Sequence, residues 1–179
     1  MLLSYIELCA LALEGVITPV EHEHINAASI DVRLGSTVLV ERPSENVAIV
    51  DYTKRQGLAM DCVDITGGHF DLQPGQFVLA HTLEQFNLPT DICAEFKLKS
   101  SGARIGLNNM LATWCDNGWH GSVLTLELHN VTRHHTIRLR AGDKIGQMIF
   151  YRTTPVPDDR SYAARGRYNK DSSAQQIKR

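Results

Sequence analysis

The chain has 179 residues, of which 21% are charged and 43% hydrophobic, and its formal net charge is -2. One domain of this length buries roughly two thirds of the surface of its unfolded chain, so it needs no disulfide or structural metal. The balanced charge argues against a surface built to bind nucleic acid, and the longest apolar run, LCALALEGVI, is too short to span a bilayer. We therefore expect neither a nucleic-acid partner nor a membrane partner.

The four cysteines are spread along the chain without a CxxC pair, and no signal peptide precedes them. This pattern is typical of reduced thiols, so we expect a cytoplasmic protein, or one in the host cytoplasm if the source is viral. Each cysteine is interpreted as a small buried hydrophobic residue.

Residues 4–14, SYIELCALALE, are expected to form a helix at the amino terminus. Ser4 and Glu7 have the spacing of a capping box, and Gly15 is placed to end the helix. Its apolar positions are expected on the buried face; they are Ile6, Leu8, Leu11 and Leu13.

After the helix, short segments alternate between apolar and polar residues and are separated by Gly, Pro, Asn or Asp. They are SIDVRLGSTVLVE, GQFVLAHTLEQFNL, ICAEFKLKS, SVLTLELHN, TIRLR and KIGQMIFYR. Many short strands at this spacing predict a mainly β fold, an antiparallel barrel or jelly roll. We expect one domain over residues 1–152, with residues 153–179 as its carboxyl-terminal tail.

The alternation also predicts which side chains share a face. In SVLTLELHN, Leu124, Leu126 and Leu128 are expected inward, and Val123, Thr125 and Glu127 on the opposite face. Glu127 is therefore a carboxyl group on a mostly apolar strand, where burial should raise its pKa toward the range useful for proton transfer.

Two segments carry the clearest chemistry. KLKSSGARIG (97–106) follows a predicted strand and places Ser100, Ser101 and Arg104 on an expected surface loop, where they could bind phosphate oxygens. ATWCDNGWHG (112–121) adds Asp116 and Trp119 in a turn, and Trp119 could be a core residue or could stack on a ring or sugar. The basic tail could be a solvated segment or a lid over a phosphate-bearing ligand.

Several motifs in order resemble the dCTP deaminases of the dUTPase superfamily. They are INAASIDVRLG (25–35), LQPGQFVLAHTLEQFNLP (72–89), SSGARIG (100–106), DNGWHGSVLTLELHN (116–130) and RAGDKIGQMIF (140–150). The resemblance implies a dUTPase-like β fold and a homotrimer whose active sites lie between subunits. The segment between Trp119 and Glu127 is one residue longer than is usual in the family, so a β-bulge is needed for Glu127 to face the pocket.

By the same resemblance, dCTP is hydrolysed to dUTP and ammonia, with Glu127 as general base and acid on the water that attacks C4 of the cytosine. Ser100 and Arg104 would act with it at the reacting centre. Mg²⁺ would arrive on the triphosphate of the nucleotide, with no metal ligand from the protein. The implied substrate-binding residues are Lys99, Ser101, Ala112, Asp116, Trp119, Arg167, Tyr168 and Gln175.

A zinc deaminase is not expected. The chain lacks the Pro-Cys-x-x-Cys pair of the zinc deaminases, and its eight histidines, including those in EHEH (21–24) and RHH (133–135), are interpreted as surface residues. Two alternatives stay open. Asp116 keeps open a dUTP diphosphatase, or a bifunctional enzyme that releases dUMP directly. A regulatory nucleotide-binding protein without turnover is the second possibility.

Overall fold

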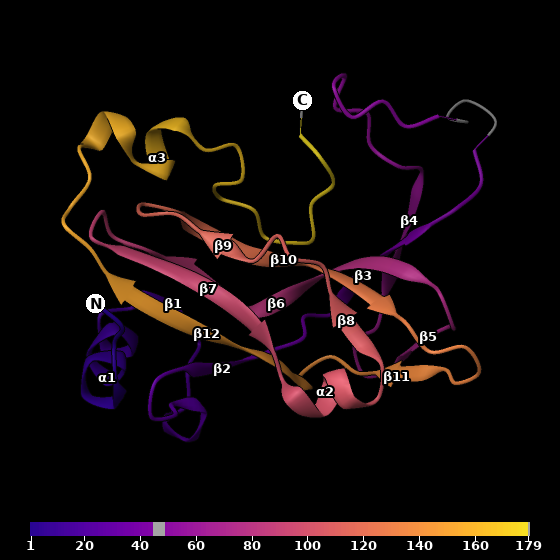
Figure 1. The fold of residues 1–179 in the computed structure, drawn as a ribbon, viewed down its shortest axis with the longest axis horizontal. Coiled ribbons are helices and arrows are strands. Elements are labelled where there is room, and N and C mark those ends of the chain that lie inside the picture. Colours follow the sequence, from indigo (N-terminus) through magenta and orange to yellow (C-terminus); the bar gives the residue numbers. More distant parts are fainter. Residues whose placement is uncertain (45–48, 179) are drawn as a thin grey trace.

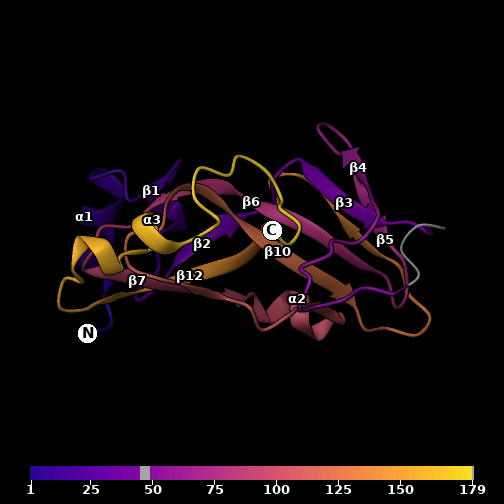
Figure 2. The ribbon, with the colours of Figure 1, turned by 90° about the horizontal axis from the view of Figure 1, so that it is seen from above.

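A computed structural model of the chain describes residues 1–44 and 49–178. Two antiparallel sheets share one hydrophobic core, and the helix α1 (Tyr5–Leu13) lies at one end of them, beside the amino terminus (Figure 1). Seen from above, α1 and the strand β5 (Phe70–Leu72) lie at opposite ends of an elongated molecule (Figure 2). No helix among the described residues is long and apolar enough to cross a membrane.

The larger sheet has the order β4-β3-β6-β10-β8, with β1 also paired to β6, and the second sheet has the order β2-β12-β7-β9. Strands β11 and β5 form a separate pair. The remaining bounds are β1 Ile17–Thr18, β2 Ile30–Arg33, β3 Thr37–Glu41, β4 Met60–Asp64, β6 Phe77–Asn87, β7 Ile92–Leu98, β8 Leu107–Asn109, β9 Trp114–Cys115, β10 His120–Asn130, β11 Ile137–Leu139 and β12 Lys144–Arg152. Short helices are α2 (Ser100–Arg104), α3 (Tyr162–Arg165) and the 3₁₀ turns η1 (His22–His24) and η2 (Asp158–Arg160).

The predicted mainly β fold with one amino-terminal helix is confirmed. All strand pairs are antiparallel, and the sheets are jelly-roll-like, with open edges at β4, β8, β2 and β9 within the described residues, so they do not close into a barrel. Five short strands escaped the sequence pattern because two to five residues show too little alternation to recognise; they are β1, β4, β5, β8 and β9.

The capping box of α1 is present, because the backbone N–H of Ser4 donates to Glu7 Oε2 at 2.9 Å. Gly15 follows the helix in the left-handed region, with φ of 74°, as its position predicted. The predicted buried face is only half right. Leu8 and Leu11 are buried, whereas Ile6 and Leu13 are 80% and 90% exposed, because the helix packs on the core along one narrow stripe.

Strands β6 and β10 are the longest pair and form the centre of the larger sheet. Their register shifts between Val123 and Thr125, so the bulge that the sequence required is present. Beyond it, Leu126 and Leu128 are fully buried as predicted. Leu124 is half-buried: it packs against the core as predicted and also lines the cavity, because the bulge interrupts the alternation.

The prediction that histidines lie on the surface is wrong for two of them, and the prediction that cysteines are buried is wrong for Cys62. His24 and His81 are buried, at 3% and 7% exposure. Cys93 and Cys115 are buried as expected, but Cys62 is exposed, and all four cysteines are free thiols. Sequence alternation misjudges His81 because its imidazole lies against Gly35, where the absent side chain leaves room for the ring.

Candidate active site

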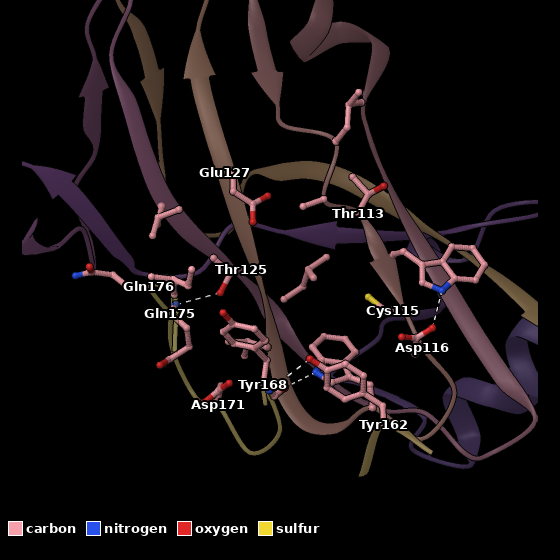
Figure 3. A pocket seen from close by; sticks show the side chains of 18 residues that line it. Thr113, Cys115, Asp116, Thr125, Glu127, Tyr162, Tyr168, Asp171, Gln175 and Gln176 are labelled. Atoms are coloured by element: carbon pink, nitrogen blue, oxygen red, sulfur yellow. Dashed lines mark hydrogen bonds between the residues drawn. The ribbon is translucent and has the colours of Figure 1, made fainter. Parts of the chain in front are cut away.

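A cavity of about 520 Å³ lies between β10, the segment Leu111–Asp116 and the carboxyl-terminal tail (Figure 3). Strand β10 contributes residues 123–125 and Glu127 to the wall, and β6 contributes Leu79. The remaining lining residues come from the turn before β10 and from the tail; they are Trp119, Tyr162, Tyr168, Asp171, Gln175, Gln176 and Ile177. The cavity therefore lies where the centre of the larger sheet meets the carboxyl-terminal tail, two parts of the chain that are far apart in sequence.

Glu127 is a carboxyl group of the cavity whose pKa is strongly raised. Burial raises the pKa of its carboxyl group from 4.5 to about 7, as the apolar surroundings in the sequence predicted. Its Oε2 is buried and has no hydrogen-bond partner among the described residues. A buried carboxyl oxygen without a hydrogen-bond partner costs free energy in the folded protein.

The segment Leu111–Asp116 forms the wall opposite β10. It leaves β8 at Met110, whose backbone N–H donates to the carbonyl oxygen of Glu127 at 3.0 Å. It then joins the second sheet, where Cys115 pairs with Ala94 of β7. One short segment thus spans both sheets and holds a fixed wall close to Glu127.

Trp119 lines the cavity, but most of its side chain is packed in the core. Its indole is 5% exposed and stacks on Phe86, with ring centroids 5.3 Å apart. Its Nε1 donates to the carbonyl oxygen of Tyr168 at 2.5 Å, which ties the tail to the turn before β10. The sequence left open whether Trp119 is a core residue or stacks on a ligand, and the structure shows that it is mostly a core residue.

The tail packs against β10 and is not a solvated segment. The backbone N–H of Val123 donates to the carbonyl oxygen of Asp171 at 2.8 Å, and that of Gln175 donates to Thr125 Oγ1 at 3.0 Å. Lys178 Nζ lies 2.5 Å from Asp171 Oδ1 and 5.3 Å from the centre of the Tyr168 ring. Tail and strand thus form one wall.

Most of the predicted pocket residues meet at this cavity. Glu127, Ala112, Asp116, Trp119, Tyr168 and Gln175 line it. Asp116 is exposed at the rim, where its Oδ1 accepts a hydrogen bond from Trp114 Nε1 at 2.9 Å.

The predicted phosphate group of residues lies elsewhere in the chain. Ser100, Ser101 and Arg104 are exposed on helix α2, not on the expected loop, and none of them lines the cavity. Lys99 is bound to Asp31, with 2.7 Å between Nζ and Oδ1, and Arg167 is exposed outside the cavity. A single chain therefore does not bring α2 together with Glu127.

Several residues that line the cavity were not among the predicted site residues, and two of them are polar residues of β10 and the tail. Thr125 and Asp171 line the cavity, and Asp171 has a buried Oδ2 without a hydrogen-bond partner among the described residues. The alternation placed Thr125 on the same face of the strand as Glu127, and this could have predicted that Thr125 lines the cavity. Nothing local to Asp171 marks it, because its position depends on how the tail folds back.

Within the described residues, one group of three acidic or histidine side chains is close enough to hold a metal ion, and it lies outside the cavity. It consists of Glu21, Glu23 and His24. Arg33 and Lys144 already contact its two carboxylates, at 3.2 and 3.9 Å.

The fold and the cavity define a mainly β protein with a pocket whose wall carries a carboxyl group of raised pKa. Comparison with known proteins identifies the family. The family model described as dCTP deaminase-like matches residues 3–153, and the chain belongs to that family.

Two curated relatives carry the name "dCTP deaminase, dUMP-forming". The one from Methanospirillum hungatei is 39% identical over 138 residues, which cover 76% of this chain and 72% of the relative. The one from Nanoarchaeum equitans is 35% identical over 178 residues and covers 90% and 87%. These names give dUMP as the product, whereas the sequence resemblance had implied dUTP.

Among solved structures, the crystal structure of 2′-deoxycytidine 5′-triphosphate deaminase from Agrobacterium tumefaciens superposes with a TM-score of 0.66 at 23% identity. The match covers 85% of this chain and 47% of that chain, so the protein spans about half the length of the solved one. This likeness supports the fold.

Proposed function

We propose that the protein deaminates dCTP by hydrolysis in the cavity that Glu127 lines. The observation that carries the proposal is the carboxyl group of Glu127, which has a pKa of about 7 and a buried Oε2 without a hydrogen-bond partner among the described residues. Half-ionised near neutral pH, such a group can both accept and return a proton. Membership of the dCTP deaminase-like family supports the choice of reaction.

In the proposed mechanism, Glu127 takes a proton from a water molecule as the water oxygen forms a bond to C4 of the cytosine. This proton passes to the ring nitrogen N3, which receives the electron pair of the C4–N3 double bond. Glu127 then transfers the remaining proton of the added hydroxyl to the amino group on C4, the C4–N bond breaks, and ammonia leaves as the C4 carbonyl forms. Glu127 ends in the ionised state in which it began. The protein supplies no metal to this step; Mg²⁺ enters with the triphosphate as part of the substrate, in a cytoplasmic enzyme.

The proposal includes a homotrimer in which α2 of one chain completes the cavity of its neighbour. Ser100, Ser101 and Arg104 are exposed and outside the cavity of their own chain, so only a second chain can bring them to Glu127. Large apolar side chains beside α2 and the cavity mouth are exposed, as expected of a surface covered by another subunit. They are Ile105, Met110, Leu111 and Trp114.

A second candidate function is release of dUMP and pyrophosphate by the same protein. It is favoured by the dUMP-forming names of the relatives and by Asp116, a carboxylate at the cavity rim. In that reaction Asp116 would activate a second water molecule against the α-phosphate.

The test is incubation of the purified protein with dCTP and Mg²⁺, followed by ammonia measurement and ion-exchange separation of the nucleotides. Ammonia with dUTP supports the deaminase alone, and ammonia with dUMP and pyrophosphate supports the second candidate. The variant Glu127→Gln keeps the shape of the side chain and removes the base, so ammonia release should fall by about 10² to 10⁴-fold. A normal rate in this variant would contradict the mechanism.

A further inference from the structure

The residue that precedes α2 is tied to a buried carboxylate on β2. Lys99 lies between β7 and α2, and its Nζ is 2.7 Å from Asp31 Oδ1. Strand β12 lies between β2 and β7, so this pair links two strands that are not neighbours in the sheet. The side chain of Asp31 is 6% exposed and that of Lys99 is 31% exposed. Solvent and salt screen such a pair less than a fully exposed one, so the contact holds the start of α2 to β2.

Asp31 is itself held by its neighbours. Its Oδ1 also accepts a hydrogen bond from Asn26 Nδ2 at 2.9 Å. The backbone N–H of Asn26 donates to the carbonyl oxygen of Ser29 at 2.8 Å, which closes the turn before β2. Ser29 Oγ donates to Gln147 Oε1 at 3.0 Å, and Gln147 lies opposite Asp31 on β12. A buried carboxylate with two donors on a paired strand is an anchor of defined position.

Helix α2 lies at the surface beyond the end of β7 (Figure 1), and none of its five residues is buried. Its position therefore depends largely on the chain at its two ends. After the helix, the carbonyl oxygen of Gly106 accepts from the backbone N–H of Val131 at 2.9 Å. Before the helix, the backbone N–H of Lys99 donates to the carbonyl oxygen of Ile145 at 3.2 Å, and the Lys99 side chain binds Asp31. Lys99 is thus anchored through both its main chain and its side chain.

The side chains that are expected to bind phosphate oxygens belong to this helix. They are Ser100, Ser101 and Arg104, and all three are exposed. Several charge-assisted hydrogen bonds to one triphosphate form together only if the donors are held in the right relative positions. A displacement of about 1 Å can cost up to about 100-fold at such a site. The anchor at the start of α2 therefore bears on how well the helix meets a phosphate group.

The same pair bears on the role of Lys99. The family resemblance implied that Lys99 binds the substrate directly. In the structure its ammonium group contacts Asp31. Moving that group to a phosphate would leave the buried carboxylate of Asp31 without its cation, which is costly. Direct binding requires this pair to break, whereas positioning of α2 requires it to stay.

We infer that Asp31 is a positioning residue that acts on the substrate through Lys99 and α2. Lys99 then serves as the link between the buried carboxylate and the helix, in place of a direct phosphate ligand. This inference rests on the proposed function, because the proposed trimer brings α2 to the triphosphate of a nucleotide in the cavity of a neighbouring chain.

The experiment measures dissociation constants for dCTP and dCMP with Mg²⁺ by calorimetry. It uses the Glu127→Gln protein, which removes turnover, and adds Asp31→Asn, Lys99→Met or both. Positioning predicts that each single change weakens dCTP binding by about 5- to 50-fold, because the donors of α2 lose their alignment. Binding of dCMP, which lacks the β- and γ-phosphates, should weaken by less than about threefold. The two changes together should weaken dCTP binding no more than the larger single effect, since both break one contact.

Direct binding by Lys99 predicts the opposite result for Asp31→Asn. That change removes a negative charge near the phosphates and releases the ammonium group of Lys99, so dCTP binding should stay the same or become tighter. Either result would overturn the inference. Equal weakening of dCTP and dCMP would overturn it as well, because Asp31 would then support the fold of the cavity in general. Independent, multiplying effects of Asp31→Asn and Lys99→Met would show that the two residues do not act through one contact.

Lys97→Met is the matched control. Lys97 is exposed on β7, two residues before Lys99, and pairs with Glu95 of the same strand. The change removes the same charge from the same part of the surface and leaves the contact with Asp31 intact. Both nucleotides should therefore bind as tightly as they do to the parent protein.

Urea unfolding shows whether each variant is folded. If Asp31→Asn does not fold, Asn26→Ala takes its place, because it removes the second hydrogen bond to Asp31 Oδ1 without changing any charge. Positioning predicts that Asn26→Ala weakens dCTP binding by about two- to fivefold and leaves dCMP binding unaltered. Unaltered dCTP binding in this variant would overturn the inference.

Failure of the proposed function gives a different result. If the wild-type protein binds dCTP but releases no ammonia, the deaminase proposal fails, and the comparison of dCTP with dCMP still decides the role of Asp31. If it binds neither nucleotide, both proposals fail.

Discussion

The backbone N–H of Met110 donates a hydrogen bond to the carbonyl oxygen of Glu127, with 3.0 Å between nitrogen and oxygen. This bond fixes where the segment Leu111–Asp116 leaves β8, and that segment then forms the wall opposite Glu127. The backbone of Glu127 is thus part of the sheet, while its Oε2 is buried without a partner among the described residues. The main chain of Glu127 therefore stabilises the fold through this hydrogen bond, whereas its buried carboxyl group destabilises the fold.

The first prediction follows from that destabilisation. The pKa of Glu127 is about 7 in the folded protein and near 4.5 in the unfolded chain, so between these values the folded state binds more protons. The free energy of unfolding should fall as pH rises through this window, because the buried carboxyl group must ionise. Relative to wild type, Glu127→Gln should be about 2 to 3 kcal/mol more stable at pH 8 and little changed at pH 4.5. Urea unfolding at the two pH values measures the difference, and a pH-independent gain would contradict it.

His81 gives a prediction of opposite sign. Its Nε2 accepts a hydrogen bond from the backbone N–H of Thr37 at 3.3 Å, so its Nδ1 carries the proton that bonds the carbonyl oxygen of Thr82 at 2.8 Å. Burial lowers the pKa of His81, so the unfolded chain binds the extra proton more readily. The stability supplied by neutral His81 is present above the pKa of an unfolded histidine, about 6.5, and is lost as pH falls through the folded value.

The change His81→Gln tests this assignment, because an amide can accept from Thr37 and donate to Thr82 without titrating. Urea unfolding between pH 7.5 and pH 5 measures the free energy of unfolding of both proteins. As pH falls, the free energy of unfolding of the variant should rise relative to that of wild type. His134→Gln, at an exposed position, is the control and should follow wild type throughout. A constant gap for His81→Gln would mean that His81 does not titrate in this range.

A third prediction concerns sites shared between subunits. If Arg104 of one chain serves Glu127 of another, then Arg104→Ala and Glu127→Gln chains should each be inactive alone. Mixed trimers formed by co-expression should regain deamination, because about one quarter of randomly mixed interfaces join an intact Arg104 to an intact Glu127. No recovery in purified mixed trimers would show that both residues act within one chain, whereas full activity of Arg104→Ala alone would show that Arg104 has no role. Trimer content is checked by light scattering.

Asp116 supplies a fourth prediction, which separates the two candidate reactions. Asp116→Asn keeps the acceptor oxygen that bonds Trp114 Nε1, so the rim of the cavity should keep its shape. If Asp116 activates water against the α-phosphate, this change should convert a dUMP-forming enzyme into one that accumulates dUTP, with ammonia release reduced by less than about tenfold. Ion-exchange analysis of the products decides the outcome. Continued dUMP formation at the wild-type rate would remove Asp116 from the reaction.

Local patterns in the sequence determined the type of fold and part of the site. The capping box at Ser4 and the alternation in β7 and β10 depend on neighbours within a few residues, so they could be predicted from the chain alone. The same holds for the raised pKa of Glu127, since apolar residues flank it on its own strand. The bulge at Val123 was also predicted, from the spacing of the family motifs.

Only the tertiary structure decided which residues meet. The exposed faces at Ile6 and Leu13, the buried ring of His81 and the cavity position of Asp171 all depend on contacts between segments far apart in the chain. The separation of α2 from the cavity depends on the path of the chain after β7, which alternation does not encode. The local sequence determines which backbone conformations have low free energy. Packing between distant segments determines which surfaces are buried, and therefore which polar atoms are left without hydrogen-bond partners.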